Sequence, residues 1–304
     1  MSLKKVLLVG GNGTLGTVLL DSLVSSNSFD VTVAKRASSS SKPAHADIAT
    51  IPDDMSVDGL VPVLKDYDVV IASFPLKDVT QHTRLAEAAS KAGVKRFVPA
   101  DFGSCDAQSD EAKKLLRLYR DKDRVRERCV ELAGQNSGFS WTALVCGHFF
   151  DYGVRDGLLH TDLKTNTATI LDKGDVPASA STLRRVAEAL VAALQRPDVS
   201  RNRVLYVQSF CKTQLEVVAA LEKATGAQWT REHVDSAAFV EREVNKYAVN
   251  QSHHAMEEIV FVLGALDADW RKKDDFAMKE LGLEDEDMDK VVQEIVDGWK
   301  KEQK

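Results

Sequence analysis

Short apolar runs alternate with helix-like segments through the first half of the chain. A helix is clearest over Val79–Ala92, where apolar residues recur every three or four positions and Gly93 follows as a stop signal. Further helices are predicted over Met55–Lys65 and Asp110–Ala133. The apolar runs that predict strands are Val6–Val9, Phe29–Lys35, Tyr67–Ser73, Val94–Val98 and Ser140–Cys146, with a short edge strand at Ala46–Ile48. This alternation predicts an α/β fold with a parallel, doubly wound sheet.

A glycine-rich turn, GGNGTLG at residues 10–16, ends the first strand, and a helix-like segment follows at once. In a dinucleotide-binding turn the first glycine permits a tight bend, the second lets pyrophosphate approach the backbone, and the third allows close helix packing. The pattern therefore predicts a Rossmann-type site, with a ligand-free glycine turn as the alternative. The predicted cofactor-binding residues of the turn are Gly10, Gly11, Asn12, Gly13, Thr14, Leu15 and Gly16.

A basic residue, Arg36, directly follows the second predicted strand. An acidic residue at this place would bind the ribose hydroxyls of NAD, whereas a guanidinium can grip the additional phosphate of NADP. Ser38 and Lys42 follow nearby and are predicted to contribute. We therefore expect NADPH to be preferred over NADH, and a solvated loop charge is the alternative.

A lysine occupies the apolar stripe of the helix predicted over Asp110–Ala133. Lys122 fills the step between Leu118 and Val125. An ammonium in a partly apolar site loses hydration, which lowers its pKa and makes it a usable proton donor or acceptor. Lys122 is thus the candidate catalytic residue, and a lysine that snorkels to solvent is the alternative. Tyr119 lies one residue too close for the usual Tyr-x-x-x-Lys pair and is interpreted as a packing residue.

The carboxyl ends of parallel strands share one rim, where ligands bind. We expect this rim to carry the glycine turn and Arg36, together with Ser73, Phe74 and Pro75, the Pro99–Gly103 loop and Gly147–Phe150. His148 is a second catalytic candidate, because an imidazole there could orient a substrate or share a proton with Lys122. A histidine bonded to the backbone is the alternative.

The pattern is looser beyond residue 150. It predicts a short hairpin at Thr167–Leu171 with Gly174–Asp175, and a helix over Ser181–Leu194 capped by Ser179 or Ser181. A strand at Arg203–Gln208 is expected to return to the main sheet. Further helices are predicted at Thr213–Thr225, Ser236–Tyr247, Ser252–Leu263 and Asp285–Lys300. We therefore divide the chain into a cofactor domain, residues 1–150, and a smaller, mainly helical substrate-binding or cap region, residues 151–304.

Aromatic residues of the second half are open to two interpretations. They could line an apolar substrate pocket, or they could belong to the core, as aromatic residues at helical spacing more often do. The residues concerned are Phe239, Phe261, Trp229 and Trp270.

Composition narrows the partners. The 304 residues carry a formal net charge of −6 with both signs mixed, so nucleic acid is not an expected partner. No apolar run approaches a bilayer span and no signal-peptide pattern is present, so no membrane partner is expected. Four scattered cysteines without a C-x-x-C pair predict reduced thiols and a cytoplasmic location. No metal motif is present, and the oligomeric state is not predicted.

Several stretches together resemble the NmrA-like, isoflavone-reductase-like family of atypical short-chain dehydrogenase/reductases. They are GGNGTLG at 10–16, AKRASS at 34–39, AGVKRFVPADFG at 92–103, YRDKDRVRERCVE at 119–131 and GHFFDYG at 147–153. The resemblance implies that Gly10, Gly13 and Gly16 hold the pyrophosphate, Arg36 and Lys42 the 2′-phosphate, and that Lys122 is the catalytic lysine. It also implies that Phe102 and Phe149 border the nicotinamide.

Two positions depart from the plant members of that family. The chain has PADFG where those usually have PSEFG, and His148 where they usually have asparagine. A fungal-type reductase is therefore a better expectation than an enzyme of plant phenylpropanoids. The predicted function is NADPH-dependent reduction of a small aromatic metabolite at a C=C, C=O or benzylic C–O bond. The alternative is a dinucleotide sensor that regulates a partner protein and catalyses little.

Overall fold

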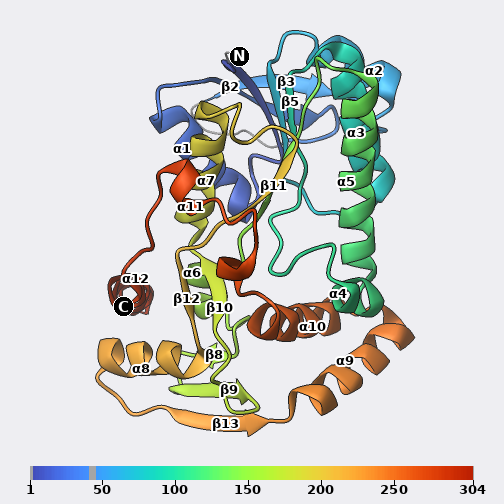
Figure 1. The fold of residues 1–304 in the computed structure, drawn as a ribbon. Coiled ribbons are helices and arrows are strands. Elements are labelled where there is room, and N and C mark those ends of the chain that lie inside the picture. The colour runs from blue at the N-terminus through green and yellow to red at the C-terminus, as the bar shows by residue number, and fades with distance from the viewer. Residues whose placement is uncertain (1–2, 41–45, 304) are drawn as a thin grey trace.

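A parallel sheet forms the centre of the first half of the chain. The computed structural model describes residues 3–40 and 46–303 (Figure 1), so Lys42 lies outside the described residues. Five strands run in the order β3-β2-β1-β4-β5. They are β1 (Lys5–Val9), β2 (Asp30–Arg36), β3 (Asp47–Ile51), β4 (Val69–Ala72) and β5 (Arg96–Val98). All neighbouring pairs are parallel.

The sheet continues with two further strands. β6 (Thr142–Val145) pairs in parallel with β11 (Arg203–Tyr206), and a parallel bridge between Phe97 and Trp141 joins β6 to β5. The second half of the chain therefore returns a strand to the main sheet, as predicted. The Phe97 N–H donates to the carbonyl of Ser140 at 2.8 Å, which extends the ladder across this junction.

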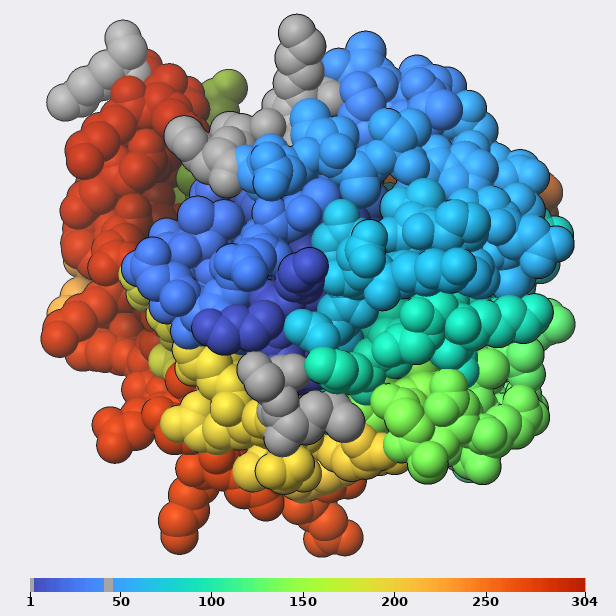
Figure 2. All heavy atoms as spheres, turned by 90° about the horizontal axis from the view of Figure 1, so that it is seen from above, coloured from blue at the N-terminus to red at the C-terminus, as the bar shows by residue number. Residues whose placement is uncertain are grey.

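Helices cover both faces of this sheet. α1 (Thr14–Ser25) and α7 (Leu183–Gln195) pack on one face, and α2 (Val57–Leu64), α3 (Val79–Ala92) and α5 (Arg117–Gln135) cover the other (Figure 1). Figure 2 shows the yellow segment that includes α7 lying beside the blue N-terminal segment. The predicted doubly wound α/β fold is confirmed, and it buries both faces of the parallel sheet.

The second half adds two three-stranded sheets and most of the remaining helices. The order β12-β10-β7 comprises β7 (His148–Phe149), β10 (Ala178–Ser181) and β12 (Phe210–Lys212). The order β13-β9-β8 comprises β8 (Thr161–Asp162), β9 (Thr167–Leu171) and β13 (Thr230–Val234). The helices are α6 (Phe150–Arg155), α8 (Gln214–Thr225), α9 (Ser236–Asn250), α10 (His253–Leu266), α11 (Met278–Leu281) and α12 (Met288–Glu302), with a 3₁₀ turn at Trp270–Lys272.

Local signals fix α3 at both ends. The Asp78 side chain accepts a hydrogen bond from the Thr80 N–H and caps the first turn. Gly93 adopts the left-handed conformation, φ 84°, and closes the last turn. The helix therefore spans Val79–Ala92, the range predicted from the sequence.

The single helix predicted over Asp110–Ala133 is wrong at one position. The chain forms α4 (Asp110–Leu115) and then α5, separated by Leu116 in extended conformation (φ −127°, ψ 131°). Leu116 is fully buried in a cluster with Tyr119 and Val145. The helix is therefore interrupted where Leu116 is buried, and helical periodicity alone does not predict this interruption.

Two details of the second half also differ from the prediction. β9 pairs antiparallel with the preceding β8, so the hairpin lies before Thr167 and not at Gly174–Asp175. The N-cap of α7 is Thr182, whose hydroxyl accepts from the Arg185 N–H at 3.0 Å. Ser179 and Ser181, the predicted caps, belong instead to strand β10.

Candidate functional site

Three of the four glycines of the turn, Gly10, Gly13 and Gly16, differ in what a side chain would meet at each position. Gly10 has φ +98°, and an added Cβ would lie 2.7 Å from the Ser73 backbone. A Cβ on Gly16 would lie 2.0 Å from the Gly10 carbonyl oxygen. A Cβ on Gly13 would make only ordinary van der Waals contacts, with the Gly10 carbonyl oxygen at 3.6 Å and the Ser73 carbonyl oxygen at 3.9 Å. The fold itself thus requires Gly10 and Gly16 but not Gly13, which lies where the α1 N-terminus offers its free N–H groups.

A cleft of about 330 Å³ lies beside this turn, at the carboxyl ends of β1, β2 and β4. Five predicted cofactor residues line it: Gly10, Asn12, Arg36, Phe74 and Pro75. It also contains Lys35, which lies beside Arg36 on β2, and four residues that were not predicted from the sequence: Ser39, Met55, Lys77 and Gln81. The signal for Ser39 and Lys77 was their position after β2 and β4, since both strands end at the predicted rim.

Other residues of the predicted set lie near this cleft but not on its wall. Gly11 packs toward Val33, and Leu15 packs against the core beneath α1. Thr14 lines a neighbouring cleft with Asp151 and Arg155. The Ser38 hydroxyl donates to Asp53 at 2.6 Å, so this pair orders the loop after β2.

The cleft fits a dinucleotide phosphate. The Ser73 hydroxyl, just after β4, is buried and has no hydrogen-bond partner among the described residues, although Ser73 is not on the wall of the cleft. Gly13 leaves room for a phosphate at a helix N-terminus. Arg36 is exposed at the mouth and forms no ion pair with any of the described residues, so its guanidinium is available for a 2′-phosphate.

Lys122 lies on α5 opposite the loop that follows β5. Its Nζ donates to the carbonyl oxygen of Asp101 at 2.5 Å and lies 5.5 Å from the centre of the Tyr119 ring. Burial lowers the pKa of Lys122, although the nearby Asp101 carboxylate acts in the opposite direction. Leu76, His82 and Pro99 form the narrow space around it. Tyr119 is buried, as its interpretation as a packing residue predicts.

A buried ion cluster, which the sequence analysis missed, holds the same loop. Arg126 forms an ion pair with the Asp101 carboxylate through Nε, and its Nη1 donates to Asp106 at 2.9 Å. Asp106 also accepts from the Tyr206 hydroxyl at 2.7 Å and from Lys273 Nζ at 3.3 Å. Burial raises the pKa of Asp106, but the Tyr206 and Arg126 contacts outweigh it and hold the pKa below its usual range.

The two phenylalanines predicted beside the nicotinamide lie on the same core. Phe102 is only 8% exposed and adopts a left-handed conformation, φ 39°. Phe149, on β7, is half-buried and packs against the same core cluster. A phenylalanine at positive φ is strained, and such strain concentrates at functional loops.

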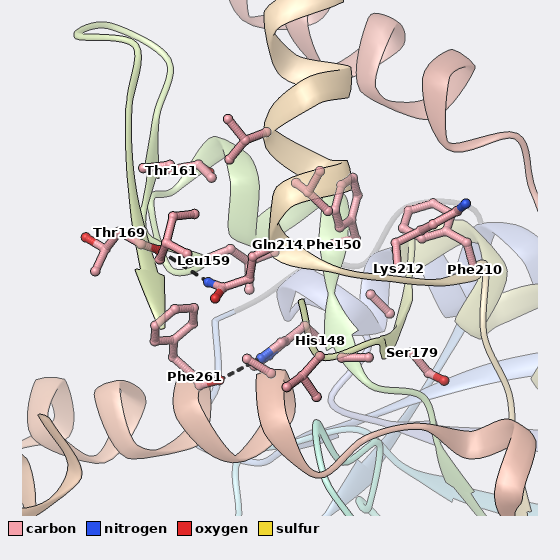
Figure 3. Close-up of a pocket in the computed structure, with 18 residues that line it drawn as sticks. His148, Phe150, Leu159, Thr161, Thr169, Ser179, Phe210, Lys212, Gln214 and Phe261 are labelled. Atoms are coloured by element: carbon pink, nitrogen blue, oxygen red, sulfur yellow. Dashed lines mark hydrogen bonds between the residues drawn. The ribbon is translucent and has the colours of Figure 1, made fainter. Parts of the chain in front are cut away.

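His148 projects from β7 into a different environment. Its Nε2 lies 3.1 Å from the carbonyl oxygen of Phe261 on α10 (Figure 3). Burial lowers the pKa of His148 to about 4, and the contact with the Phe261 carbonyl only partly opposes this. The ring is therefore neutral near pH 7 and bonded to the backbone, which was the alternative interpretation.

An apolar cavity of about 70 Å³ adjoins His148. Figure 3 shows it between α10, α8 and the strands of the second half, with Phe150, Phe210 and Phe261 around it. Of the four aromatic residues proposed from the sequence, Phe261 lines this cavity. The other three, Trp229, Phe239 and Trp270, are between 1% and 5% exposed and belong to the core.

Among residues 3–40 and 46–303, no group of three or more His, Cys, Asp or Glu side chains is arranged to hold a metal ion. No helix in those same ranges has both the length and the apolarity needed to cross a bilayer.

Comparisons with known proteins agree with the fold. Oxidoreductase aprR of Aspergillus flavus is 35% identical over 233 residues, covering 76% of this chain and 77% of the relative. Oxidoreductase poxI of Penicillium oxalicum is 26% identical over 250 residues, covering 82% and 79%. Among solved structures, AtPrR2 with NADP⁺ and (+)-pinoresinol matches with a TM-score of 0.78 at 20% identity, covering 97% and 99%. The leucoanthocyanidin reductase–NADPH complex of Vitis vinifera matches with a TM-score of 0.78 at 18% identity, covering 96% and 99%.

Fold, glycine turn and cleft together define a protein of the Rossmann type, with its cleft at the edge of the sheet where dinucleotides bind in this fold. The family model described as the NmrA-like family matches residues 2–300. The chain belongs to the NmrA-like family, and the resemblance drawn from its motifs is confirmed.

Proposed function

We propose that this protein reduces a small aromatic metabolite with hydride from NADPH, and that Lys122 is the general acid or base. The position of Lys122 carries the proposal. Its ammonium lies at the carboxyl end of β5, partly withdrawn from water, and it donates to the carbonyl oxygen of Asp101 rather than to a carboxylate. An ammonium has three donors. Within the described residues only one is committed, so two remain for a substrate oxygen.

The remaining residues of the site have separate tasks. NADPH bound in the cleft would supply the hydride. Gly13, Arg36 and Ser73 would bind its phosphates, while Lys122 would give a proton to, or take one from, a phenol, carbonyl or enol oxygen. Reduction of a C=C, C=O or benzylic C–O bond is compatible with this role.

Two observations support an aromatic substrate. The cavity beside His148 is lined mainly by apolar side chains, including Phe150, Phe210 and Phe261. Its volume of about 70 Å³ is below the roughly 150 Å³ of a cavity that holds benzene, so the cavity would have to widen before an aromatic ring could enter. Several relatives are named for aromatic compounds, among them isoeugenol synthase 1 of Petunia hybrida, which is 28% identical. The PADFG loop and His148 favour a substrate other than the plant compounds.

The division into a cofactor domain, residues 1–150, and a substrate-binding region, residues 151–304, belongs to the same proposal. α7 and β11 are the exceptions, since they pack with the first half. The four cysteines are free thiols, which supports the expected cytoplasmic location.

NADPH oxidation against a panel of aromatic ketones, enones and benzylic ethers tests the proposal. Lys122→Ala should bind NADPH normally and lose at least about a hundredfold in turnover, a loss typical of a removed general acid. Lys114→Ala, which removes an exposed lysine of α4, is the matched control and should retain activity. Full turnover in Lys122→Ala would remove Lys122 from the mechanism. Tight NADP⁺ binding with no turnover of any panel member would instead favour the regulatory sensor.

A further inference from the structure

Helix α5 grips one residue, Asp101, at two points. Lys122 donates to its backbone carbonyl, and Arg126, one turn later, pairs with its carboxylate. Residues four apart lie on the same helix face, so the two cations approach the loop side by side. Asp101 is 4% exposed and Arg126 is 2% exposed. The loop that presents the Lys122 acceptor is therefore fixed by an ion pair shielded from water.

Arg126 also ties this loop to the second half of the chain. Its other carboxylate partner, Asp106, receives the Tyr206 hydroxyl from β11 and Lys273 from the segment before α11. A buried guanidinium is costly unless it is paired, and removing one partner of such a pair is strongly destabilising. Arg126 pairs through Nε and Nη1, while its Nη2 is buried and has no hydrogen-bond partner among the described residues. Here the pairing holds the acceptor of the candidate catalytic group.

We propose that Arg126 is a positioning residue that, through Asp101, holds the Lys122 ammonium at the carboxyl end of β5 and sets its protonation. This inference rests on the proposed role of Lys122. Arg126 then does more than pack in the core, because it both orients the Asp101 loop and balances the negative charge of that loop.

The groups that face Lys122 indicate the direction of the effect. Near pH 7 most of them are neutral, because burial raises the pKa of the Cys105 and Cys146 thiols to about 12 and raises that of Tyr119. Burial likewise lowers the pKa of His82, on α3, to about 4. Among the described residues, Asp101 and Arg126 are therefore the charged groups that act most directly on Lys122.

These two charges oppose each other. The Asp101 carboxylate raises the pKa of Lys122 and the Arg126 guanidinium lowers it, after burial itself has lowered it most. Removal of the guanidinium would leave Asp101 and its neighbour Asp106 less compensated. The Lys122 ammonium would then hold its proton more tightly, and its pKa would rise.

The test measures Lys122 itself, by NMR titration of protein carrying ¹³C-labelled lysine. The Lys122 Cε resonance is assigned by its loss in Lys122→Met. In Arg126→Gln the pKa of Lys122 should rise by about one unit or more. Arg126→Lys keeps the charge but loses the fork that reaches both carboxylates. It should leave the pKa near its original value, keep KM for NADPH, and lower kcat about tenfold with any active panel member.

Arg96 supplies a matched control at the other end of β5. It is fully buried, but it donates to the neutral oxygens of Ser140, Thr142 and Ser200. Arg96→Gln should lower stability without moving the pKa of Lys122. An unchanged Lys122 pKa in folded Arg126→Gln would overturn the inference, as would an equal shift in Arg96→Gln. If Arg126→Gln does not fold, a wild-type kcat in Arg126→Lys would overturn it. Full turnover in Lys122→Met would refute the proposed function, whereas the titration would still report whether Arg126 controls the lysine.

Discussion

A substitution at Gly13 should affect cofactor binding much more than folding. Gly13 has φ −77° and ψ 168°, an ordinary extended conformation, and its Cβ would meet the Gly10 carbonyl oxygen at 3.6 Å. Gly13→Ala should therefore fold and lose only about 1 kcal/mol, because alanine is a poorer N-cap than glycine. The methyl group would occupy the space where a pyrophosphate approaches, so NADPH should bind about a hundredfold more weakly.

Gly16→Ala is the contrasting variant. Its Cβ would lie 2.0 Å from the Gly10 carbonyl oxygen, so the turn must move. Such overpacking costs about 1–3 kcal/mol, occasionally more. Helix propensity returns up to about 1 kcal/mol of that. A displaced turn should also bind NADPH poorly, so this variant loses stability and affinity together.

Denaturation with and without cofactor measures both quantities. NADPH at one hundred times Kd should stabilise the unmodified protein by about 2.7 kcal/mol. At the same concentration a hundredfold weaker Gly13→Ala gains only about 0.4 kcal/mol. The reasoning is refuted if Gly13→Ala keeps the full NADPH stabilisation. It is also refuted if Gly13→Ala, without cofactor, unfolds as readily as a Gly16→Ala variant that has lost several kcal/mol.

Two further predictions follow from single side chains. Arg36→Ala should weaken NADPH binding roughly 10- to 100-fold, because it removes charge-assisted hydrogen bonds to the 2′-phosphate, while NADH binding changes little. Fluorescence titration with both cofactors measures the two affinities. Equal losses of affinity for NADPH and NADH would reject the phosphate contact. Burial lowers the pKa of His82 to about 4, so the unfolded chain takes up a proton first as pH falls below about 6.5, and stability falls toward pH 4. His82→Phe should remove up to about 3 kcal/mol of this acid-induced loss of stability. Unfolding curves at pH 7 and pH 4.5 give the loss for each protein, and an equal loss in the variant and in the unmodified protein would contradict the prediction.

The fold was predictable where local signals agree with tertiary structure. Val79–Ala92 has a cap, a periodic apolar face and a terminal glycine, and each acts within one turn of the chain. Leu116 shows the opposite case, since nothing in the adjacent residues marks it as the break between α4 and α5. The break exists because Leu116 is buried by residues distant in the sequence, such as Val145.

The candidate site divides along the same line. The glycine turn, Arg36 and Lys122 were found because each departs from, or completes, a pattern readable within a few residues. Lys77 and Ser39 were not predicted, because their place on the cleft wall depends on the conformation of the loops that follow β4 and β2. His148 was predicted at the rim, but its direction toward α10 depends on the pairing of β7 with β10, which is remote in sequence.

Lys122 and Arg126 show why one buried charge on a helix can be predicted from the sequence while another on the same helix cannot. A lysine in an apolar stripe violates the expected helix pattern, so it is noticed. An arginine beside that stripe, on a helix rich in arginine, looks like one more solvated charge. Its burial follows only when Asp101 and Asp106 fold over the helix, since two carboxylates then make burial of a guanidinium tolerable. A pair of acidic residues flanking a predicted rim loop is therefore the sequence signal that should prompt a search for a buried cation on the helix that follows.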